Sequence, residues 1–424
     1  MAVVEVELDE LRRLVGKDLS RQEVIDDLFQ LGVEYEGEGE DGELEFEVVP
    51  DRPDRLSVEG LARSLRYDYG MERGVRIPDV EEGDYTIKVD ESVSDVRPYI
   101  TGAVVRNIDL SGGVLDSIIQ LQEKLHSTLG RRRNKGAIGV HDLTMLKGKT
   151  IEYRAIDPDD ETFVPLAIGG DEEEQELAEM TPAEVMEDHP VGKDYAHILE
   201  GAENVPAIYD SIGLFSFPPV INGKRTEVKE ASRDLFIEMT GIDQWTIDKM
   251  LNILLYVLNE RGGTIEEVEV EYAGRSQLKP DFSTKTKTVY HDDIESVLGI
   301  EMLPDEITDL LERSGMDAQE FGDSERQYEA TVPPYRTDVM HPLDVIDDIG
   351  RAYGFNDLEP RYPEVSTIGE LSEKTRLENA VRKQLVGLGF QDLLNFVLTS
   401  PENEYEAMLQ NDDDEGVHIE NPYS

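Results

Sequence analysis

Residues 244–271 read QWTIDKMLNILLYVLNERGGTIEEVEVE, a long apolar-periodic run followed by two glycines and an alternating segment. In the first part, apolar side chains recur at three- and four-residue spacing, which places them on one face of a helix. They are Ile247, Met250, Leu251, Leu254, Leu255 and Leu258. From Thr264 on, apolar and acidic residues alternate, as is typical of a half-buried strand. The stretch therefore predicts a helix over 244–260, a strand over 264–271, and a domain that mixes helices with a sheet.

The surrounding block, residues 85–275, has the same mixed character. A further helix is expected over 114–129. Strands are expected at 85–89, 99–108, 150–156, 207–209, 214–217 and 234–239. The block is predicted to be one α+β domain inserted between smaller ones. Residues 74–84, which contain Gly, Pro and acids, are predicted to form a linker before it.

The segments that flank this block share a pattern. Residues 1–75 open with a strand and a short helix, and a capping box at Ser20 and Glu23 begins a second helix. Residues 276–356 repeat the order at one constant offset, at which Gly16, Glu23, Asp26, Leu28 and Gly32 match Gly299, Glu306, Asp309, Leu311 and Gly315. The pattern predicts two small helix-turn-helix-like modules. Two copies alone are also compatible with convergent helix punctuation.

The last segment, residues 357–424, is expected to hold a helix over 371–388, an extended segment over 390–398 and a helix after Pro401. It ends on the start of a strand, which predicts an incomplete domain rather than a frayed terminus. The whole chain is thus expected to be a multidomain α+β protein. Its expected domains are 1–75, 85–275, 276–352 and 357–424.

Charge and composition set limits on function. The chain has 424 residues, 94 Asp and Glu against 41 Lys and Arg, a formal charge of −53 and no Cys. Without Cys, a disulfide scaffold, a Cys-ligated zinc site and thiol catalysis are excluded. The acids are spread among regularly spaced apolar residues, which fits a folded protein adapted to molar intracellular salt. With no apolar run near about 18 residues and no signal-peptide pattern, a cytoplasmic protein without a membrane span is expected.

Several catalytic motifs are missing. The sequence contains no G-x-x-x-x-G-K-[ST] loop and no G-x-G-x-x-G, so no ATP-phosphate cradle of these types is expected in this chain. The seven His residues are scattered, without the spacing of a metal site or a Ser/His/Asp triad.

One acidic cluster stands out after Tyr335-Arg336-Thr337-Asp338. Helical periodicity over 343–354 predicts that Asp344, Asp347 and Asp348 share the face opposite to the core. Three neighbouring carboxylates repel one another unless a cation lies among them, and such oxygen ligands suit Mg²⁺. Because about a fifth of the chain is acidic, spacing alone favours a chance cluster on a solvated face.

The only dense basic run is Arg131-Arg132-Arg133-Asn134-Lys135-Gly136, which follows an expected helix that ends at Gly130. Cations at a helix C-terminus interact favourably with the helix dipole. Against so acidic a background, contact with the phosphates of a nucleic acid is an equally good interpretation.

A third feature is the segment 211–234, in which small polar residues lie between expected strands and prolines. Ser211, Ser216 and Asn222 are followed by Thr226 and Asp234. Such a segment can line a pocket, although it is more often a β-rich core with turns.

Taken together, these features resemble the β subunit of phenylalanyl-tRNA synthetase in its archaeal/eukaryotic form. The matching motifs span the whole chain in order. They are DRPDRLSVEGLAR (51–63), LHSTLGRRR (125–133), GKDYAH (192–197), SFPPVING (216–223), RDLFIE (233–238), VPPYRTD (332–338) and DVIDDIGRAYG (344–354).

The resemblance implies a partner and cofactors. In the family, an α2β2 tetramer attaches phenylalanine to tRNA(Phe) at the expense of ATP. Aminoacylation and ATP binding reside in the α subunit, and the last β-subunit domain is synthetase-like but catalytically inert. The resemblance also implies that Asp338, Asp344, Asp347 and Asp348 bind Mg²⁺ shared with the α subunit. Many relatives have Glu in the last two places, where this chain has shorter Asp side chains.

The middle domain resembles an editing domain that hydrolyses tyrosine wrongly joined to tRNA(Phe). Tyr exceeds Phe by one hydroxyl, and an apolar pocket rejects an added hydroxyl only modestly, so a second site that recognises the phenol is needed. The resemblance implies a pocket that includes Ser211, Ser216, Asn222 and Asp234. The RNA-contact candidates are Arg131, Arg132, Arg133 and Lys135.

Two other functions remain open at this point. They are a free-standing editing hydrolase and a non-catalytic tRNA-binding scaffold. Relatives in the family continue beyond the point at which this sequence stops, which predicts a truncated or split chain.

Overall fold

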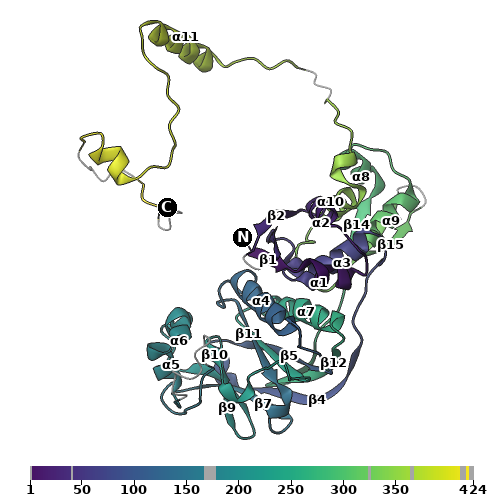
Figure 1. Cartoon of the computed structure of the whole chain (residues 1–424), viewed down its shortest axis with the longest axis vertical. Coiled ribbons are helices and arrows are strands. Elements are labelled where there is room, and N and C mark those ends of the chain that lie inside the picture. Colours follow the sequence, from purple (N-terminus) through teal and green to yellow (C-terminus); the bar gives the residue numbers. More distant parts are fainter. Residues whose placement is uncertain are drawn as a thin grey trace. The chain divides into compact units, whose positions relative to one another are not determined.

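The computed structural model describes residues 2–39, 42–166, 178–322, 326–362, 367–410 and 417–419. The chain divides into two compact units, Met1–Leu358 and Glu359–Ser424. The first unit contains three sheets with associated helices (Figure 1). The expected multidomain α+β class is therefore confirmed. In the second unit, α11 (Glu373–Gly387) confirms the helix expected over 371–388, and a short helical segment spans Glu402–Glu406.

The middle of the first unit is a ten-stranded mixed sheet of order β10-β9-β8-β7-β4-β12-β5-β11-β6, with β13 paired to β12. Its strands are β4 (Val80–Val89), β5 (Tyr99–Arg106), β6 (Gly136–Asp142), β7 (Thr150–Ile156), β8 (Val205–Asp210), β9 (Gly213–Phe217), β10 (Ile221–Asn222), β11 (Leu235–Gly241), β12 (Thr264–Tyr272) and β13 (Arg275–Lys279). Only the β4–β7 and β4–β12 pairings are parallel. The strand expected at 264–271 is thus confirmed as β12.

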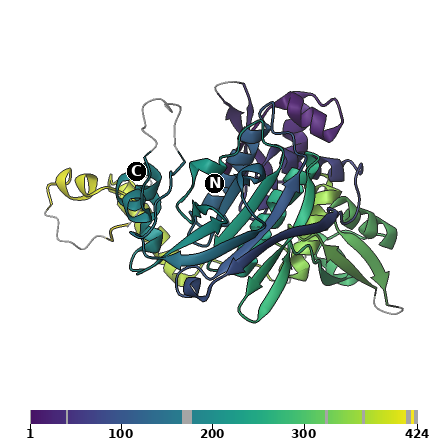
Figure 2. The ribbon, with the colours of Figure 1, turned by 90° about the horizontal axis from the view of Figure 1, so that it is seen from below.

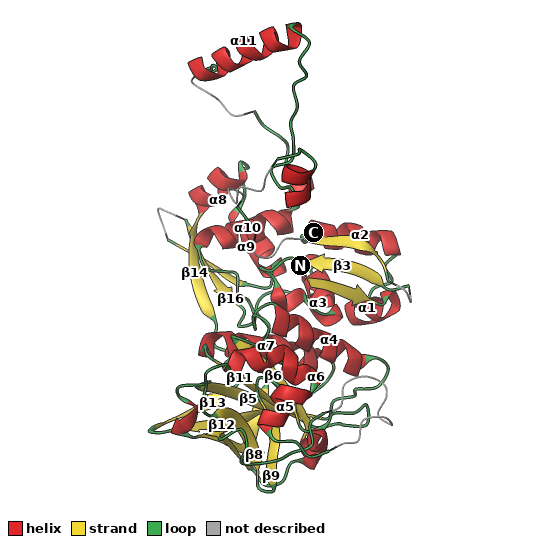
Figure 3. Ribbon diagram, turned by 90° about the vertical axis from the view of Figure 1, so that its left-hand side faces the viewer, coloured by secondary structure: helices red, strands yellow, loops and turns green. Residues whose placement is uncertain are grey.

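Helix α7 (Gln244–Glu260) has the bounds that its periodicity predicts. It packs with α4 (Val114–Ser127) against β5, β11 and β6, and these helices lie between the large sheet and the N-terminal segment (Figures 2 and 3). One continuous core joins α7, α4 and the N-terminal segment. Two short helices, α5 (Pro182–Asp188) and α6 (Pro190–Tyr195), lie near the β8–β10 end of the sheet.

The linker expected over 74–84 is wrong in its second half, because β4 begins at Val80 and pairs with β12 from Ile265 on. The prediction took glycine and acidic residues as signs of a linker, whereas Gly83 lies within strand β4 of the sheet. A Cβ there would lie 1.9 Å from the carbonyl oxygen of Glu267. The register between these strands shifts at this point, between Glu266 and Val268, and only a glycine permits such a close approach.

The repeat expected on either side of the large sheet is confirmed by topology. The first module contains β1 (Ala2–Val6), α1 (Leu8–Val15), α2 (Arg21–Gln30), β2 (Val33–Glu38), β3 (Leu44–Val48) and α3 (Val58–Asp68). The second contains β14 (Lys285–Tyr290), α8 (His291–Leu298), α9 (Pro304–Arg313), β15 (Asp317–Phe321), β16 (Gln327–Val332) and α10 (Pro342–Tyr353). Their sheets have the equivalent orders β1-β3-β2 and β14-β16-β15. Gly16 and its counterpart Gly299 end their helices at φ 77° and 73°, where glycine is favoured.

Each module also repeats a P-x-R-x-D motif before its third helix. In the first, Arg52 Nε and Nη2 each donate to the Asp54 carboxylate at 2.8 Å. In the second, Arg336 forms the same two-pronged pair with Asp338 at 2.7 and 2.6 Å. The constant offset that relates the glycines and helices does not extend to this motif, because a one-residue insertion shifts the offset before it.

Candidate functional site

A cavity of about 540 Å³ opens between α4, α6 and the sheet strands β6, β9, β10 and β11. Most of its wall is apolar and includes Leu110, Leu115, Ile118, Val140, Val191, Val228 and Leu235. Its polar lining includes Gln122, Glu123, Asp194 and Glu227, together with a group on β9–β11 and the adjoining turn, namely Ser216, Asn222, Thr226 and Glu238. An apolar cleft with a few placed polar groups is the usual form of a small-molecule site.

The polar end of the cavity centres on Glu238 in β11, which is only 2 % exposed. Ser216 Oγ lies 3.1 Å from both Glu238 Oε1 and Asn222 Oδ1. Glu238 Oε2 has no hydrogen-bond partner among the residues that the structure describes. An ionised carboxylate can accept about four hydrogen bonds, so this group retains acceptor capacity toward a ligand.

Backbone and ring packing fix the position of Glu238. A Cβ at Gly139 in the neighbouring strand β6 would lie 2.2 Å from Glu238 Oε1, so glycine makes room for the carboxylate. Behind it, the buried His141 places Nε2 3.8 Å from Glu238 Oε1, while its Nδ1 lies 2.8 Å from Thr226 Oγ1. The carboxylate is therefore held at one end of the cavity by the sheet itself.

Two of the pocket residues implied by the resemblance line the cavity, Ser216 and Asn222, and two do not. Ser211 is exposed at the turn between β8 and β9. Asp234 accepts from the backbone N–H of Asn107 at 3.1 Å and pairs with Arg106 at 3.4 Å. The Asp234 side chain is thus held just before β11 by Arg106 of the adjacent strand β5 and does not line this cavity.

The residue that sequence reasoning missed is Glu238. The signal was present in Leu235-Phe236-Ile237-Glu238-Met239-Thr240-Gly241, where one acid interrupts an otherwise uncharged strand that is buried throughout. A buried charge is rare unless it is paired or functional.

The basic run lies beside this cavity but divides in role. Arg133 lines the cavity, stacks on Tyr195 with 4.1 Å to the ring centroid, and donates to the Val220 carbonyl at 2.8 Å. Lys135 pairs with Asp243 at 2.9 Å. Arg131 and Arg132 are exposed, and neither forms an ion pair within the described residues. Only these two cations are free to meet an external anion.

The loop that carries these arginines is strained. Arg131, Arg132 and Arg133 have φ values of 48°, 52° and 65°, a left-handed conformation that costs a non-glycine residue about 1 kcal/mol or more. The fully buried Arg97 holds the loop, since it donates to the carbonyls of Arg133 and Asn134 at 3.0 and 3.2 Å. Burial lowers the pKa of Arg97 to about 10. Stored strain of this kind is typical of functional sites.

The acidic cluster differs from its expected arrangement. Asp348 is 5 % exposed and pairs with Arg336 at 2.7 Å, so it does not share a solvated face with its neighbours. Asp347 pairs with Arg351 at 2.8 Å, and Asp344 accepts from the N–H of His341 at 2.6 Å as a cap of α10. The correction follows from the repeat, because α10 packs its Asp348 side against the P-x-R-x-D arginine.

These carboxylates do not gather around one point. Within the described residues, the one group of acids or His whose ligand atoms lie within 4.8 Å of one another is Glu34, Glu36 and Glu47, on the first small sheet. Exposed acidic groups of this kind are common in so acidic a chain, and this one is not among the residues that the resemblance implies.

Comparisons with known proteins identify the domains. Residues 97–254 match the B3/4 domain and residues 287–355 match the tRNA synthetase B5 domain. Residues 358–424 match the phenylalanyl tRNA synthetase beta chain CLM domain. All the residues that line the cavity described above lie within the B3/4 match.

The chain is similar over its length to curated β subunits of phenylalanine–tRNA ligase. It is 56 % identical to that of Natronomonas pharaonis over 433 residues, covering 100 % of this chain and 74 % of the relative. It is 56 % identical to that of Haloarcula marismortui, covering 96 % and 71 %. The protein from Methanocella arvoryzae is 45 % identical, with 100 % and 75 % covered.

A solved structure agrees with these relatives. The crystal structure of an N-terminal fragment of the phenylalanyl-tRNA synthetase β subunit from Pyrococcus horikoshii superposes with a TM-score of 0.77 at 32 % identity. The match covers 83 % of this chain and 99 % of the chain in the crystal structure. No helix among the described residues is long and apolar enough to cross a membrane. Sequence, fold and domain order agree that the chain belongs to the β-subunit family of phenylalanine–tRNA ligase.

Proposed function

We propose that the cavity around Glu238 hydrolyses tyrosine from mischarged tRNA(Phe). The observation that supports this most directly is a buried carboxylate with acceptor capacity at the end of an apolar cavity. A phenol O–H offers that carboxylate a hydrogen bond, which phenylalanine lacks. The role that the resemblance implied for Asp234 thus belongs to Glu238.

The selectivity follows from desolvation. A buried acceptor left without a partner costs on the order of 1–3 kcal/mol, and hydrogen bonds to charged groups lie at the upper end of this range. Phenylalanine entering the cavity would leave Glu238 unpaired beside an apolar ring. Tyrosine would satisfy it, so the same group that accepts the error rejects the correct amino acid.

The reaction itself needs only water. Water attacks the ester carbonyl carbon, the bond to the terminal ribose oxygen breaks, and that oxygen leaves with a proton as the hydroxyl of the tRNA. Free tyrosine departs as the carboxylate. Ser216, Asn222 and Thr226 are the polar cavity residues that could orient the substrate near Glu238. Attack by a positioned water, assisted by the tRNA's own terminal hydroxyl, is the mechanism that this set of groups favours.

The test is single-turnover deacylation of Tyr-tRNA(Phe) by the whole chain at saturating protein concentration. Phe-tRNA(Phe) is the matched substrate, and we expect its ester to be hydrolysed much more slowly. Equal rates for the two substrates, or no hydrolysis of either above the rate in buffer, would remove the editing function.

Two alternatives give different results in the same assay. A free-standing hydrolase would act on Tyr-tRNA(Phe) equally well with and without the α subunit. A non-catalytic scaffold would bind tRNA(Phe) without deacylating it in either case.

Charging with phenylalanine is proposed to take place in the α subunit, which binds ATP, within an α2β2 complex that binds tRNA(Phe). The sequence of this chain contains neither G-x-x-x-x-G-K-[ST] nor G-x-G-x-x-G, the glycine-rich loops that bind nucleotide phosphates.

Arg131 and Arg132 are proposed to contact phosphates near the acceptor end of the tRNA. In the double variant Arg131→Gln/Arg132→Gln, we expect the protein concentration for half-maximal deacylation to rise roughly three- to tenfold, with the rate at saturation unchanged. The buried Arg97 and the Arg133 contacts keep the loop in place, so folding is unaffected. The control Lys88→Gln/Lys149→Gln removes the same charge from exposed residues in β4 and directly before β7, neither of which lines the cavity. Equal effects of both pairs would indicate a general charge effect.

The proposed Mg²⁺ site has carboxylate oxygens that suit the ion, but they are not arranged around a common point. Asp338, Asp344, Asp347 and Asp348 are hard oxygen ligands, yet Arg336 holds two of them and Arg351 a third. The residues therefore do not fit a cation site within this chain alone, and an ion shared with the α subunit would have to displace these guanidinium groups.

A Mg²⁺ titration tests this point. For the chain alone, we expect calorimetry to show the same weak Mg²⁺ binding in the wild type and in Asp344→Asn/Asp347→Asn. In a complex with the α subunit, the same substitutions should raise the Mg²⁺ concentration needed for half-maximal charging. Asp84→Asn/Asp159→Asn is the matched control at exposed positions. Unchanged charging titrations would return the cluster to a structural role.

A further inference from the structure

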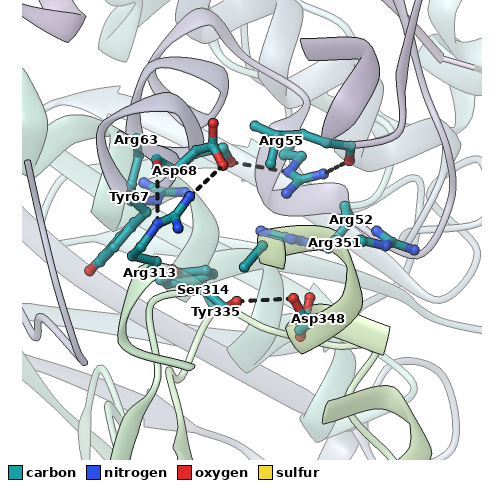
Figure 4. A pocket seen from close by; sticks show the side chains of 13 residues that line it. Arg52, Arg55, Arg63, Tyr67, Asp68, Arg313, Ser314, Tyr335, Asp348 and Arg351 are labelled. Carbon is teal, nitrogen blue, oxygen red and sulfur yellow. Dashed lines mark hydrogen bonds and ion pairs between the residues drawn. The ribbon is translucent and has the colours of Figure 1, made fainter. Parts of the chain in front are cut away.

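The two modules meet around a small polar cavity of about 30 Å³ that the proposed editing function does not use (Figure 4). Five arginines line it, namely Arg52, Arg55, Arg63, Arg313 and Arg351, against two carboxylates, Asp68 and Asp348. In a chain where acids outnumber bases by more than two to one, such an excess of cations in the interior needs an explanation.

Four of the five arginines have a carboxylate partner. Arg52 pairs with Asp54 and Arg63 with Glu260, at 2.8 and 2.7 Å. The other two pairings are those of Arg313 with Asp68 and of Arg351 with Asp347. The second carboxylate that lines the cavity, Asp348, forms an ion pair with Arg336. Both lining carboxylates are therefore already paired with an arginine other than Arg55.

Arg55 is the exception. It is 4 % exposed, and its guanidinium donates from Nε to Ser64 Oγ at 3.1 Å and from Nη1 to the carbonyl of Leu31. It forms no ion pair within the described part of the chain, where its Nη2 also has no hydrogen-bond partner. Burial, and after it the charge of Arg52, lowers the pKa of Arg55 to about 9.

The internal repeat shows what is missing. Helices α3 and α10 are equivalent, and the position in α3 that corresponds to Asp348 of α10 is Ser64. In the second module Asp348 pairs with Arg336, the counterpart of Arg52, and Val339 stands at the position of Arg55, so Arg55 is a cation that the second module does not have. In the first module the hydroxyl of Ser64 meets Arg55 and brings no charge. Asp54 and Asp68 act on Arg55 only from beyond ion-pair distance. A buried cation without a carboxylate in contact is costly, so a closer counter-charge is expected from outside the chain.

We infer that this cavity is a binding site for one small monovalent anion of the chloride or bromide type, held between the two modules against Arg55. The volume limits the ligand. A cavity must offer about 10–15 Å³ of such volume to hold one water molecule. The cavity therefore has room for one or two water molecules or ions of similar size. The four oxygens of a phosphate or sulfate do not fit.

Water alone could satisfy the free N–H of Arg55, but it would not neutralise the charge. Cytoplasm of molar salt content, which the net charge of −53 favours, would keep even a weak site occupied. A ligand L that binds only the folded state multiplies the folding equilibrium constant by 1 + [L]/Kd, where [L] is the free ligand concentration. At a concentration ten times Kd, the folding equilibrium constant rises about elevenfold.

Thermal unfolding of the whole chain in KCl and in potassium gluconate at equal potassium concentration tests the site. Gluconate is too large for the cavity. We expect the wild type to unfold at a higher temperature in chloride, and we expect Arg55→Met to lose most of that difference. General salt effects act on both proteins alike and cancel in the comparison.

Arg97→Met is the matched control, because Arg97 is also buried without a carboxylate, yet carbonyl and hydroxyl oxygens accept from all its nitrogens. It should lower stability in both salts and keep the chloride difference. A chloride difference of the same size in the wild type and Arg55→Met would overturn the inference.

Bromide gives a direct measurement that does not depend on either variant folding. Crystals of the wild-type chain soaked in KBr should show an anomalous peak in the cavity, in contact with Arg55. Bromide peaks at the surface only, with none between the two modules, would mean adventitious binding and would overturn the inference.

Discussion

Glu238→Gln should slow the single-turnover hydrolysis of Tyr-tRNA(Phe) by roughly 5- to 150-fold, while charging with phenylalanine in a complex with the α subunit stays nearly unchanged. Glutamine has the same shape as glutamate but no charge, so the phenol loses a charge-assisted hydrogen bond worth on the order of 1–3 kcal/mol. Ser216, which contacts both Glu238 and Asn222, remains in place to hold the side chain. The measurement is the rate of tyrosine release at saturating protein concentration.

The matched control is Asp234→Asn, which removes the same charge four residues earlier. Asp234 lies outside the cavity and pairs with Arg106, so we expect at most a twofold change in the rate. If Asp234→Asn slows hydrolysis as much as Glu238→Gln does, the cavity assignment is wrong.

Stability distinguishes a role in recognition from a role in folding. Glu238 is a buried carboxylate with one oxygen unpartnered among the described residues, and removing such a charge does not lower the free energy of unfolding. Glu238→Gln should therefore unfold at the same temperature as the wild type or higher. A slow variant that also unfolds at lower temperature would point to a folding defect.

The sequence predicted elements wherever a period was long enough to be unambiguous. Helix α7 has the expected bounds because its apolar face extends over four turns, and the Ser20–Glu23 capping box is formed as expected. Strand β6 was missed, and residues 136–142 form the last strand of the sheet order, paired with β11. Its side chains face protein on both sides, so it shows no alternation, and the basic run before it drew attention to charge instead.

The functional residues divide in the same way. Ser216 and Asn222 were identified through a motif, and the structure shows them beside Glu238. Asp234 and Ser211 were carried over by the same resemblance, but their side chains are fixed by contacts with Arg106 and by a surface turn. Sequence could not show these contacts, because they join residues more than a hundred positions apart or depend on how the turn between β8 and β9 is oriented.

The arginine-rich junction shows most clearly what sequence hides. In the sequence, DRPDRLS was part of a family motif, and the run Asp344–Asp348 was a candidate metal site. In the structure, both belong to one network of buried ion pairs between the two modules, and its geometry arises only when the modules pack against each other, with α3 in contact with α9. Local spacing predicted the residues but not their partners.

Asp54→Asn should lower the free energy of unfolding by about 3–5 kcal/mol, the usual cost of breaking a buried ion pair from one side. Asp54 is 1 % exposed and accepts two hydrogen bonds from Arg52, and Arg63 Nη2 lies 4.0 Å from it. Asparagine keeps the size but leaves Arg52 without its counter-charge, while Arg63 keeps its pair with Glu260. Since a buried pair is little screened, the loss should persist in molar KCl. Chemical denaturation followed by circular dichroism measures it.

The effect of pH on this variant has a definite sign. Burial raises the pKa of Asp54, but Arg52 outweighs it and holds the pKa well below its ordinary value. A carboxylate with a depressed folded-state pKa contributes stability that is present above the unfolded pKa, about 3.9, and is lost as the pH falls through the folded value. The deficit of Asp54→Asn should therefore be constant between pH 7 and 5 and shrink at pH values below about 4. Asp84→Asn removes the same charge from an exposed pair with Lys149 and should cost less than about 1 kcal/mol at every pH. A deficit of that small size in Asp54→Asn would mean that the arginines at this junction are neutralised by other groups.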